Sequence, residues 1–307
     1  MLIDFVHLGD AYLPELQAYR HYIEGLGHGV RLHRRPDTIP PHAEVIWWIC
    51  GLVPHTVHER HAAAFHIHEY ASASVPPWAW AKDRLKRIRQ PRPGYRIFQN
   101  EWVRHRMGFT DGVPFELRDM GIAPAFLAQA PAVVVPDHDD VYLGEMSRLR
   151  QFLPVFEALG QLGRRVLLVG AVPDELSRAI ARLAHVTVTG RVPHHEVPAM
   201  LRRARVGLNL VPSRAPYGFQ TSTKMLEYCA AGLHVLSTDY PWVRDFVARH
   251  HCPVTFLPSA KNGPALRAAI GDMPATHGSA ALPTLQALAW PRLLEQLGIW
   301  RTMGLRP

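Results

Sequence analysis

The sequence predicts an α/β protein made of two Rossmann-like domains that face each other across a cleft. Its 307 residues suggest two domains of about 150 residues each. Strand-like apolar runs alternate with helical stretches in two successive series, as in parallel sheets wrapped by helices. Between the series, residues 131–140 break the pattern with Pro131, Pro136 and four polar residues. We therefore expect domains at 1–135 and 136–280, followed by a tail at 281–307.

The first series begins with an expected strand at 2–8 and an expected helix at 14–26. Gly25, Gly27 and Gly29 lie between that helix and the next strand. A dinucleotide-binding phosphate loop has the opposite order, strand first and helix after, so these glycines are predicted to end the helix and turn the chain. The further strands are expected at 30–33, 45–50, 64–68 and 96–99. The last three end in polar residues, where such a sheet places its ligand crevice.

The second series repeats the alternation from residue 141 onward. Its expected strands are 141–144, 165–169, 186–189, 206–210 and 234–237, and its expected helices are 147–162, 174–183, 195–204, 221–231 and 242–249. An amphipathic helix at 284–297, interrupted by Pro291, is expected in the tail.

Composition excludes several classes of protein. With 48% hydrophobic and 20% charged residues, the chain is neither disordered nor fibrous. No apolar run reaches the roughly 18 residues of a spanning helix, and the N-terminus carries no basic region or cleavage site, so we expect neither a membrane span nor secretion. Three scattered cysteines without a CxxC motif argue against disulfides and structural zinc, and favour the cytoplasm.

Positive charge is concentrated in one segment of the first domain. Nine Lys/Arg against Asp83 and Glu101 give residues 82–106 a net charge of +7. Trp78 and Trp80 precede it, and interfacial aromatics beside a basic helical face are typical of peripheral membrane proteins. We expect a membrane surface contact through residues 78–106, with an ordinary solvated helix as the alternative. Nucleic-acid binding is not expected, because no recognition motif accompanies the charge.

The segment most informative about chemistry is 211–239. A strand ends at Val211, a loop of small hydroxylated residues follows, and a helix starts at Thr221-Ser222-Thr223-Lys224. Free N–H groups at a helix start, joined by hydroxyls and one lysine, can bind a diphosphate. Glu227, one turn later, could accept hydrogen bonds from a pair of ribose hydroxyls. The alternative is an ordinary N-cap with a capping-box glutamate.

The C-terminal half resembles the glycosyltransferases of the glycosyltransferase-B fold, in particular the family 4-like group. The motifs that carry the resemblance are TKMLEYCAAGLHVLSTDYP (223–241), GRVPHHEVPAMLRRARVGLNLVPS (190–213), VYLGEMSRLR (141–150) and ALAWPRLLEQL (287–297), in matching order and spacing. In the N-terminal half the similarity is architectural, with FHIHEYAS (65–72) and FQNEWVRHRM (98–107) at strand ends. The resemblance implies that the tail helix crosses back to the first domain.

The resemblance also implies roles for the residues of the donor site. Glu227 would hold the nucleotide ribose, with the diphosphate at Ser222, Thr223 and Lys224. The base would lie near Arg191 and Val192, and Arg148 or Arg150 would supply a further phosphate-binding cation. A helix N-terminus with Lys and Arg can stabilise a leaving nucleoside diphosphate, so neither a metal nor a cofactor is expected.

Two departures from the family pattern concern the donor sugar and the first strand. The glutamate that usually contacts the sugar, eight positions before Glu227, is replaced by Phe219. The sugar-binding region is rebuilt as Tyr217-Gly218-Phe219-Gln220, in which Gln220 is a candidate donor contact. The usual glycine-rich loop after the first strand is reduced to Gly9-Asp10. The stereochemistry of transfer therefore stays open.

A catalytic base is sought at the strand ends of the N-terminal domain. His68 and Glu69 are the first candidates, Asp10 the second and Glu101 the third, because a carboxylate or imidazole there could take the proton of an acceptor hydroxyl. Two metal-like patterns are set aside. Asp137-His138-Asp139 lies in the expected linker and is interpreted as a solvated turn, and the His58/His61 and His66/His68 pairs lack a third ligand.

The sequence as a whole predicts a cytoplasmic glycosyltransferase, peripheral to the inner face of the membrane if the basic segment docks there. It would move a sugar from a nucleoside-diphosphate sugar to a sugar, a lipid-linked or a small-molecule acceptor, in cell-surface glycan or glycolipid synthesis. One alternative is a sugar-nucleotide epimerase, which needs no acceptor. Another is a non-catalytic binding protein, suggested by Phe219.

Overall fold

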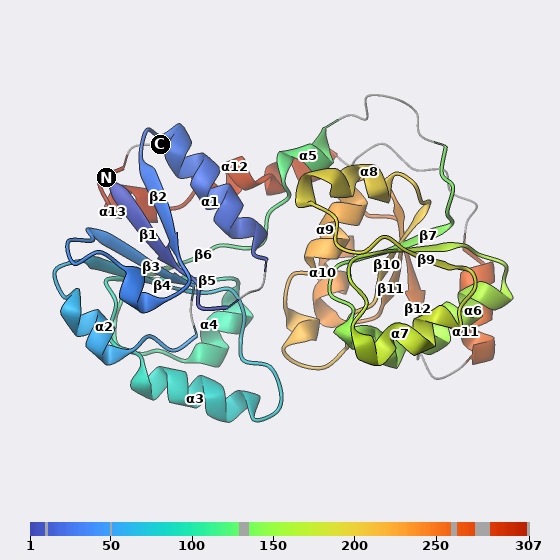
Figure 1. The fold of residues 1–307 in the computed structure, drawn as a ribbon, viewed down its shortest axis with the longest axis horizontal. Coiled ribbons are helices and arrows are strands. Elements are labelled where there is room, and N and C mark those ends of the chain that lie inside the picture. The colour runs from blue at the N-terminus through green and yellow to red at the C-terminus, as the bar shows by residue number, and fades with distance from the viewer. Residues whose placement is uncertain (10–11, 50, 129–134, 259–262, 274–282, 306–307) are drawn as a thin grey trace. The chain divides into compact units, whose positions relative to one another are not determined.

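A computed structural model describes residues 1–307 except 10–11, 50, 129–134, 259–262, 274–282 and 306–307 (Figure 1). The chain forms two compact units. The N-terminal unit is Met1–Gly121 with Trp290–Pro307, and the C-terminal unit is Ile122–Ala289. The predicted α/β class with two Rossmann-like domains is confirmed, as is the return of the tail to the first domain. The chain changes unit between Gly121 and Ile122, ahead of the boundary expected at 135.

The N-terminal unit is built on a six-stranded parallel sheet of order β2-β1-β3-β4-β5-β6. Its strands are β1 (Leu2–Val6), β2 (Gly29–His33), β3 (Val45–Ile49), β4 (Phe65–Tyr70), β5 (Tyr95–Phe98) and β6 (Phe115–Leu117). Its helices are α1 (Pro14–Gly25), α2 (His55–Arg60), α3 (Ala79–Arg89), α4 (Glu101–Met107), α12 (Trp290–Glu295) and α13 (Ile299–Thr302). The central strand β3, VIWWI, is buried over its first four residues, as expected for a parallel sheet covered on both faces.

The tail completes the core of the N-terminal unit. Trp300 of α13 is fully buried, and its ring centroid lies 5.9 Å from that of Trp47 and 5.2 Å from that of Tyr22. The Glu116 carboxylate accepts hydrogen bonds from the amides of Gly298 (2.7 Å) and Ile299 (3.1 Å), the first amides of α13. Aromatic burial and these two bonds therefore fix the tail on this unit.

The C-terminal unit has a second six-stranded parallel sheet, of order β12-β11-β10-β7-β8-β9. Its strands are β7 (Asp140–Leu143), β8 (Val166–Val169), β9 (Val186–Val188), β10 (Val206–Asn209), β11 (His234–Thr238) and β12 (Val254–Leu257). Its α-helices are α5 (Pro124–Leu127), α6 (Leu153–Gln161), α7 (Asp174–Ala181), α8 (Val197–Leu201), α9 (Thr223–Ala230), α10 (Pro241–His250) and α11 (Gly263–Gly271).

The order of these strands locates the ligand edge of the C-terminal unit. From β7 the chain adds β8 and β9 on one side, and then β10, β11 and β12 on the other. The direction reverses between β7 and β10, and open α/β sheets bind ligands outside the carboxyl ends of strands at such a switch point. The loops after β7 and β10 are therefore the expected place for a ligand.

Several expected elements differ in detail because of proline. The expected helix 147–162 is a 3-10 helix at Ser147–Phe152 followed by α6, and the expected helix 195–204 is η3 (His194–Glu196) followed by α8. Pro154 and Pro198 lie in the first turns of α6 and α8, where the missing N–H has no cost. Pro291 is the second residue of α12. The expected tail helix 284–297 is η5 (Pro283–Leu288) followed by α12, so the tail is divided at Ala289, ahead of Pro291. The structure also contains elements that were not predicted from the sequence: α2, α4, α5, α11, α13, β6 and β12.

Candidate functional site

Helix α9 begins at the switch point because Ser222 caps it. The Ser222 hydroxyl accepts a hydrogen bond from the Met225 amide (3.4 Å) and donates one to Asn209 Oδ1 (2.7 Å). Asn209, at the end of β10, donates through its side-chain amide to Ser237 Oγ (2.8 Å) and to the Tyr240 hydroxyl (2.9 Å). This buried network ties the start of the helix to two strand ends. The Met225 amide is thus capped, whereas the amides of Thr223 and Lys224 in the same turn have no intrahelical acceptor and can bind an anion.

The Lys224 ammonium lies beside the carboxyl end of β7. Its Nζ donates to the Tyr142 hydroxyl (3.0 Å) and lies 4.5 Å from the centroid of that ring. Tyr142 in turn donates to the Glu145 carbonyl (2.8 Å), in the loop after β7. A positive charge from the first turn of α9 is thus held at the carboxyl end of β7.

Three glycines form the loops after β7, β8 and β9, and the sequence analysis missed them. Gly144, Gly170 and Gly190 have φ angles of +101°, +146° and +75°, which L side chains rarely adopt. A Cβ on Gly170 would lie 2.7 Å from the Gly144 carbonyl oxygen, and Gly170 forms a backbone bridge with Gly190. The loops therefore meet here as bare backbone. The sequence does carry a signal for these glycines, because each one directly follows a strand or lies within two residues of its end.

Glu227 is buried one turn along α9 and is joined to a histidine that the sequence analysis did not single out. Glu227 Oε1 lies 3.1 Å from His194 Nε2, in η3 after β9. Burial raises the pKa of Glu227, and His194 and then Lys224 oppose that rise. The Phe126 ring of α5 lies 5.2 Å from the His194 ring. The predicted ribose-binding carboxylate therefore already has one protein partner.

The rebuilt segment Tyr217–Gln220 contacts the loop after β7. The Arg148 guanidinium lies 4.5 Å above the centroid of the Tyr217 ring, a cation–π contact. Gln220 Nε2 is buried and has no hydrogen-bond partner among the described residues. Since a buried donor without a partner costs free energy, this amide is a candidate ligand contact. Arg150 is exposed beside Arg148 in the same 3-10 helix.

The residues predicted to bind the nucleotide base follow β9. Arg191 is exposed and Val192 is half-buried, directly after Gly190. They come from the loop that also supplies His194. The structure thus collects the predicted donor residues on the carboxyl ends of β7, β9 and β10 in one unit.

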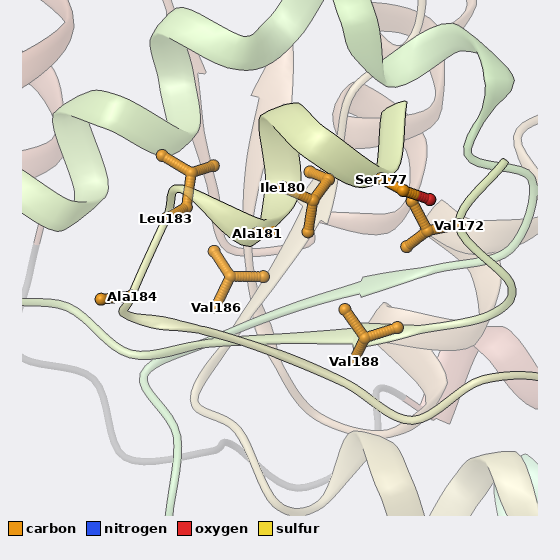
Figure 2. Close-up of a pocket in the computed structure, with 8 residues that line it drawn as sticks. All are labelled: Val172, Ser177, Ile180, Ala181, Leu183, Ala184, Val186 and Val188. Atoms are coloured by element: carbon orange, nitrogen blue, oxygen red, sulfur yellow. The ribbon is translucent and has the colours of Figure 1, made fainter. Parts of the chain in front are cut away.

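A surface hollow elsewhere in the C-terminal unit contains none of these residues. Figure 2 shows the side chains that line it, from α7 and β9 and the residues beside them, among which Ser177 is the one polar side chain. Without a charged or nucleophilic group, it offers no chemistry for a nucleotide sugar.

The residues predicted as catalytic bases, all in the N-terminal unit, lie in different surroundings. His68 and Glu69 are fully buried, because β4 continues to Tyr70 beyond its expected end at 68. Glu69 accepts from Trp47 Nε1 (2.7 Å) and pairs with Arg118. Neither ring nitrogen of His68 has a hydrogen-bond partner in the described chain, and burial lowers its pKa well below the usual value. Asp10 lies outside the described residues.

These positions do not coincide with the switch point of the N-terminal sheet. That switch lies between β1 and β3, whereas His68 and Glu69 are on β4. Glu101, the third candidate, is exposed and accepts a hydrogen bond from Arg104 Nε (2.6 Å). A catalytic role for any of the four stays a prediction.

The acidic residues before β7 bind arginines. Asp137 pairs with Arg203 (2.7 Å), and Asp139 with Arg205 (3.1 Å). Arg203 and then His138 hold the pKa of Asp137 far below its usual range. These carboxylates therefore connect the start of β7 to the segment between α8 and β10. Across the described residues, no group of three or more His, Cys, Asp or Glu could hold a metal ion.

Residues 139–273 match the family model described as glycosyl transferases group 1. The match spans β7 to α11 and includes every predicted donor residue. This segment is similar to the group 1 glycosyltransferases. The matched segment contains the switch point, the cap of α9 and the glycine loops described above.

Solved structures extend the similarity to the whole chain. Sucrose-phosphate synthase from Thermosynechococcus elongatus is 15% identical, with a TM-score of 0.71 and 99% of each chain covered. The HepE protein of Anabaena, solved with UDP and glucose, is 13% identical, with a TM-score of 0.71 and 99% of each chain covered. The UDP-GlcNAc 2-epimerase of Methanocaldococcus jannaschii is 10% identical, with a TM-score of 0.56 and 99% of each chain covered. At these identities the likeness establishes the glycosyltransferase-B fold.

No curated protein matches the chain by sequence. Among the helices of the described residues, none has the length and apolar character needed to cross a bilayer.

Proposed function

We propose that the protein transfers a sugar from a nucleoside-diphosphate sugar to an acceptor hydroxyl, without a metal or a further cofactor. The observation that carries this proposal is the start of α9 at the switch point of the C-terminal unit, with Lys224 beside it. The nucleotide sugar would be bound there as a substrate.

The chemistry of the leaving group supports this assignment. When the bond between the sugar and the diphosphate breaks, negative charge develops on the diphosphate. The first amides of α9, the Thr223 hydroxyl and the Lys224 ammonium can stabilise that charge, and Arg148 and Arg150 lie in the loop after β7. These groups would supply the positive charge that a metal ion provides in other transferases.

The remaining donor contacts are assigned from the resemblance, together with the burial of Glu227 and of the Gln220 amide. Glu227 would accept hydrogen bonds from the ribose hydroxyls, with His194 holding one of its oxygens. The unpartnered amide of Gln220 would donate to the sugar or the diphosphate, in the region where Phe219 replaces the family's glutamate. Arg191 and Val192 would lie at the base.

The N-terminal unit would bind the acceptor, which is a sugar, a lipid-linked molecule or a small molecule. Asp10, His68 and Glu69 stay the candidates for its proton acceptor. We place the reaction in the cytoplasm, in the synthesis of cell-surface glycans or glycolipids, on the resemblance to the family and the nature of such acceptors.

The assignment of Glu227 is tested by isothermal calorimetry with the nucleoside diphosphate found by a thermal-shift screen of UDP, GDP and dTDP sugars. Glu227→Ala should weaken binding about tenfold to a hundredfold, because a hydrogen bond to a charged group contributes roughly 1.5–3 kcal/mol. Glu175→Ala, on the exposed face of α7, is the matched control and should bind as the parent does. Equal affinities for all three proteins would refute the assignment.

Incubation with a labelled donor separates transfer from the epimerase alternative. Sugar release or isomerisation with the donor alone would indicate an epimerase, to which the fold is also similar. A product that forms only when an acceptor is added, and forms equally in EDTA, is the result that we expect. Strong dependence on a divalent ion would contradict the metal-independent part of the proposal.

A further inference from the structure

Helix α3 of the N-terminal unit buries no apolar side chain. Asp83 is its one buried residue, whereas Trp80 and Ile88 are 57% and 67% exposed. A helix that supports a core presents an apolar stripe to that core. In α3 the large apolar side chains face outward. Figure 1 shows α3 at the outer edge of its unit.

The outward face of α3 combines apolar side chains with cations. Trp80, Arg84 and Ile88 are spaced by four residues, so they lie along one face of the helix, and all three are exposed. Leu85 and Arg89 form a neighbouring exposed row with the same spacing.

The single acid of α3 is turned away from this face. Asp83 accepts hydrogen bonds from the Ser74 amide (2.9 Å) and from Arg106 Nε (3.0 Å), both inside the unit. The outward side chains of this helix are therefore apolar or positive. In the part of the chain that the structure describes, Arg84, Arg87 and Arg89 form no ion pair.

Two features adjoin this face. Trp78, just before α3, is 70% exposed and has a φ angle of +61°, a conformation that costs a non-glycine residue about 1–2 kcal/mol. Strain of this kind collects at functional positions. Next to the helix is an open hollow lined by apolar Leu52, Val75 and Leu85 and by Lys82 and Lys86. It therefore combines an apolar lining with two ammonium groups.

We infer that α3 and Trp78 dock on an anionic phospholipid surface. The indoles and Ile88 would enter the interface between headgroups and acyl chains, and the guanidinium groups would reach lipid phosphates. A nucleic acid would match the cations alone and would leave the exposed Trp and Ile side chains in water. The inference does not depend on the donor site, since α3 belongs to the other unit.

Vesicle sedimentation tests the inference with the full-length protein and no nucleotide. We expect binding to vesicles of phosphatidylcholine mixed with phosphatidylglycerol, and little binding to phosphatidylcholine alone. Arg84→Glu with Arg89→Glu should lower the partition coefficient at least tenfold, since each cation near such a surface contributes about fivefold. Trp80→Ala with Ile88→Ala should lower it several-fold, also at high salt, where electrostatic attraction is screened.

Matched controls come from the C-terminal unit. Arg178→Glu with Arg182→Glu changes the net charge equally on exposed positions of α7 and the residue after it, and Leu162→Ala with Val188→Ala removes exposed apolar groups. Both should bind vesicles as the parent does. Equal losses in test and control variants, equal binding to neutral vesicles, or unchanged binding of the α3 variants would overturn the inference. So would binding to duplex DNA that exceeds vesicle binding and depends on the same arginines.

Discussion

At the scale of single residues, the proposed donor site depends on a buried carboxylate, and burial disfavours its charged form. Glu227 accepts hydrogen bonds from a ribose most strongly when it is ionised, yet burial raises its pKa above the ordinary value of 4.5. The His194 hydrogen bond and the Lys224 charge are the two groups that oppose this rise. His194 is therefore a positioning residue for Glu227, acting through that carboxylate.

This pairing predicts a pH dependence of nucleotide binding. Protonation of Glu227 removes its negative charge and turns one of its oxygens into a donor, so affinity should be highest well above its raised pKa and should fall as the pH drops through it. His194→Ala removes a group that lowers this pKa, so the fall should move to higher pH. Calorimetry across the pH range in which the protein stays folded would measure both midpoints.

His194→Gln supplies the control, since its amide can donate to Glu227 without carrying charge. It should restore affinity at high pH. A purely structural role for His194 would lower affinity equally at every pH, and this result would contradict the prediction. Glu227→Gln should bind weakly with no pH dependence from this carboxyl.

At the scale of elements, the switch point is held open by the packing of α9 on the sheet. Strands β7 and β10 pair at Val206 with Asp140 and at Gly207 with Val141. Beyond this, the Tyr228 hydroxyl accepts from the Leu143 amide (2.8 Å) and donates to the Leu208 carbonyl (3.4 Å). A side chain of α9 therefore satisfies backbone groups of both strands.

Gly207 makes this packing possible, and its replacement should be costly. A Cβ at Gly207 would lie 2.4 Å from the Tyr228 ring, which is fully buried and has no room to withdraw. We expect Gly207→Ala to lower the free energy of unfolding by about 1–3 kcal/mol, as overpacking does. Urea unfolding of the purified variant would measure the change.

Gly271→Ala is the matched control, because a Cβ there meets nothing within 4 Å and its backbone lies at the end of α11. It should leave stability unchanged or slightly improved. A loss for Gly271→Ala as large as that for Gly207→Ala would show that contact with Tyr228 is not the cause.

At the scale of the whole molecule, the tail joins the end of the chain to the unit that contains its beginning. Trp300 fills the core beside Trp47 and Tyr19, and Trp290 packs against Gly121, where a Cβ would lie 2.6 Å from the indole. The C-terminal unit is thus a continuous segment, whereas the N-terminal unit needs both ends of the chain.

Trp300→Ala should therefore destabilise the N-terminal unit. Removal of a buried tryptophan costs about 3–5 kcal/mol, through lost burial and the cavity left behind. We expect hydrogen exchange to accelerate in β1, β3 and α1, while β7 to β11 keep their protection. Arg301→Ala, an exposed neighbour in the same helix, should leave both patterns as they are. Equal acceleration in the two units would indicate that they unfold together.

Local pattern was sufficient for much of the fold. Alternating apolar runs predicted the five leading strands of each sheet, since buried parallel strands require them. Short or weakly apolar elements, such as β6, β12 and the single-turn α13, were not predicted, because contacts with neighbouring elements stabilise them. In the site, Ser222, Lys224 and Glu227 were predicted from their spacing on one helix start. His194 and the three glycines lie in loops that follow other strands. Their place in the site could not be predicted without knowing the order of the strands in the sheet.

By itself, therefore, the sequence determined the fold class, the resemblance of the second domain to glycosyltransferases and the position of the helix to which the donor is assigned, because these follow from contiguous patterns of a few residues. Only the tertiary structure decided that β4 runs on and buries His68 and Glu69, that His194 holds Glu227, and that α3 turns its apolar side chains outward. Each of these depends on which distant segments pack together, and the free energy of burial and of hydrogen bonding is set by those partners.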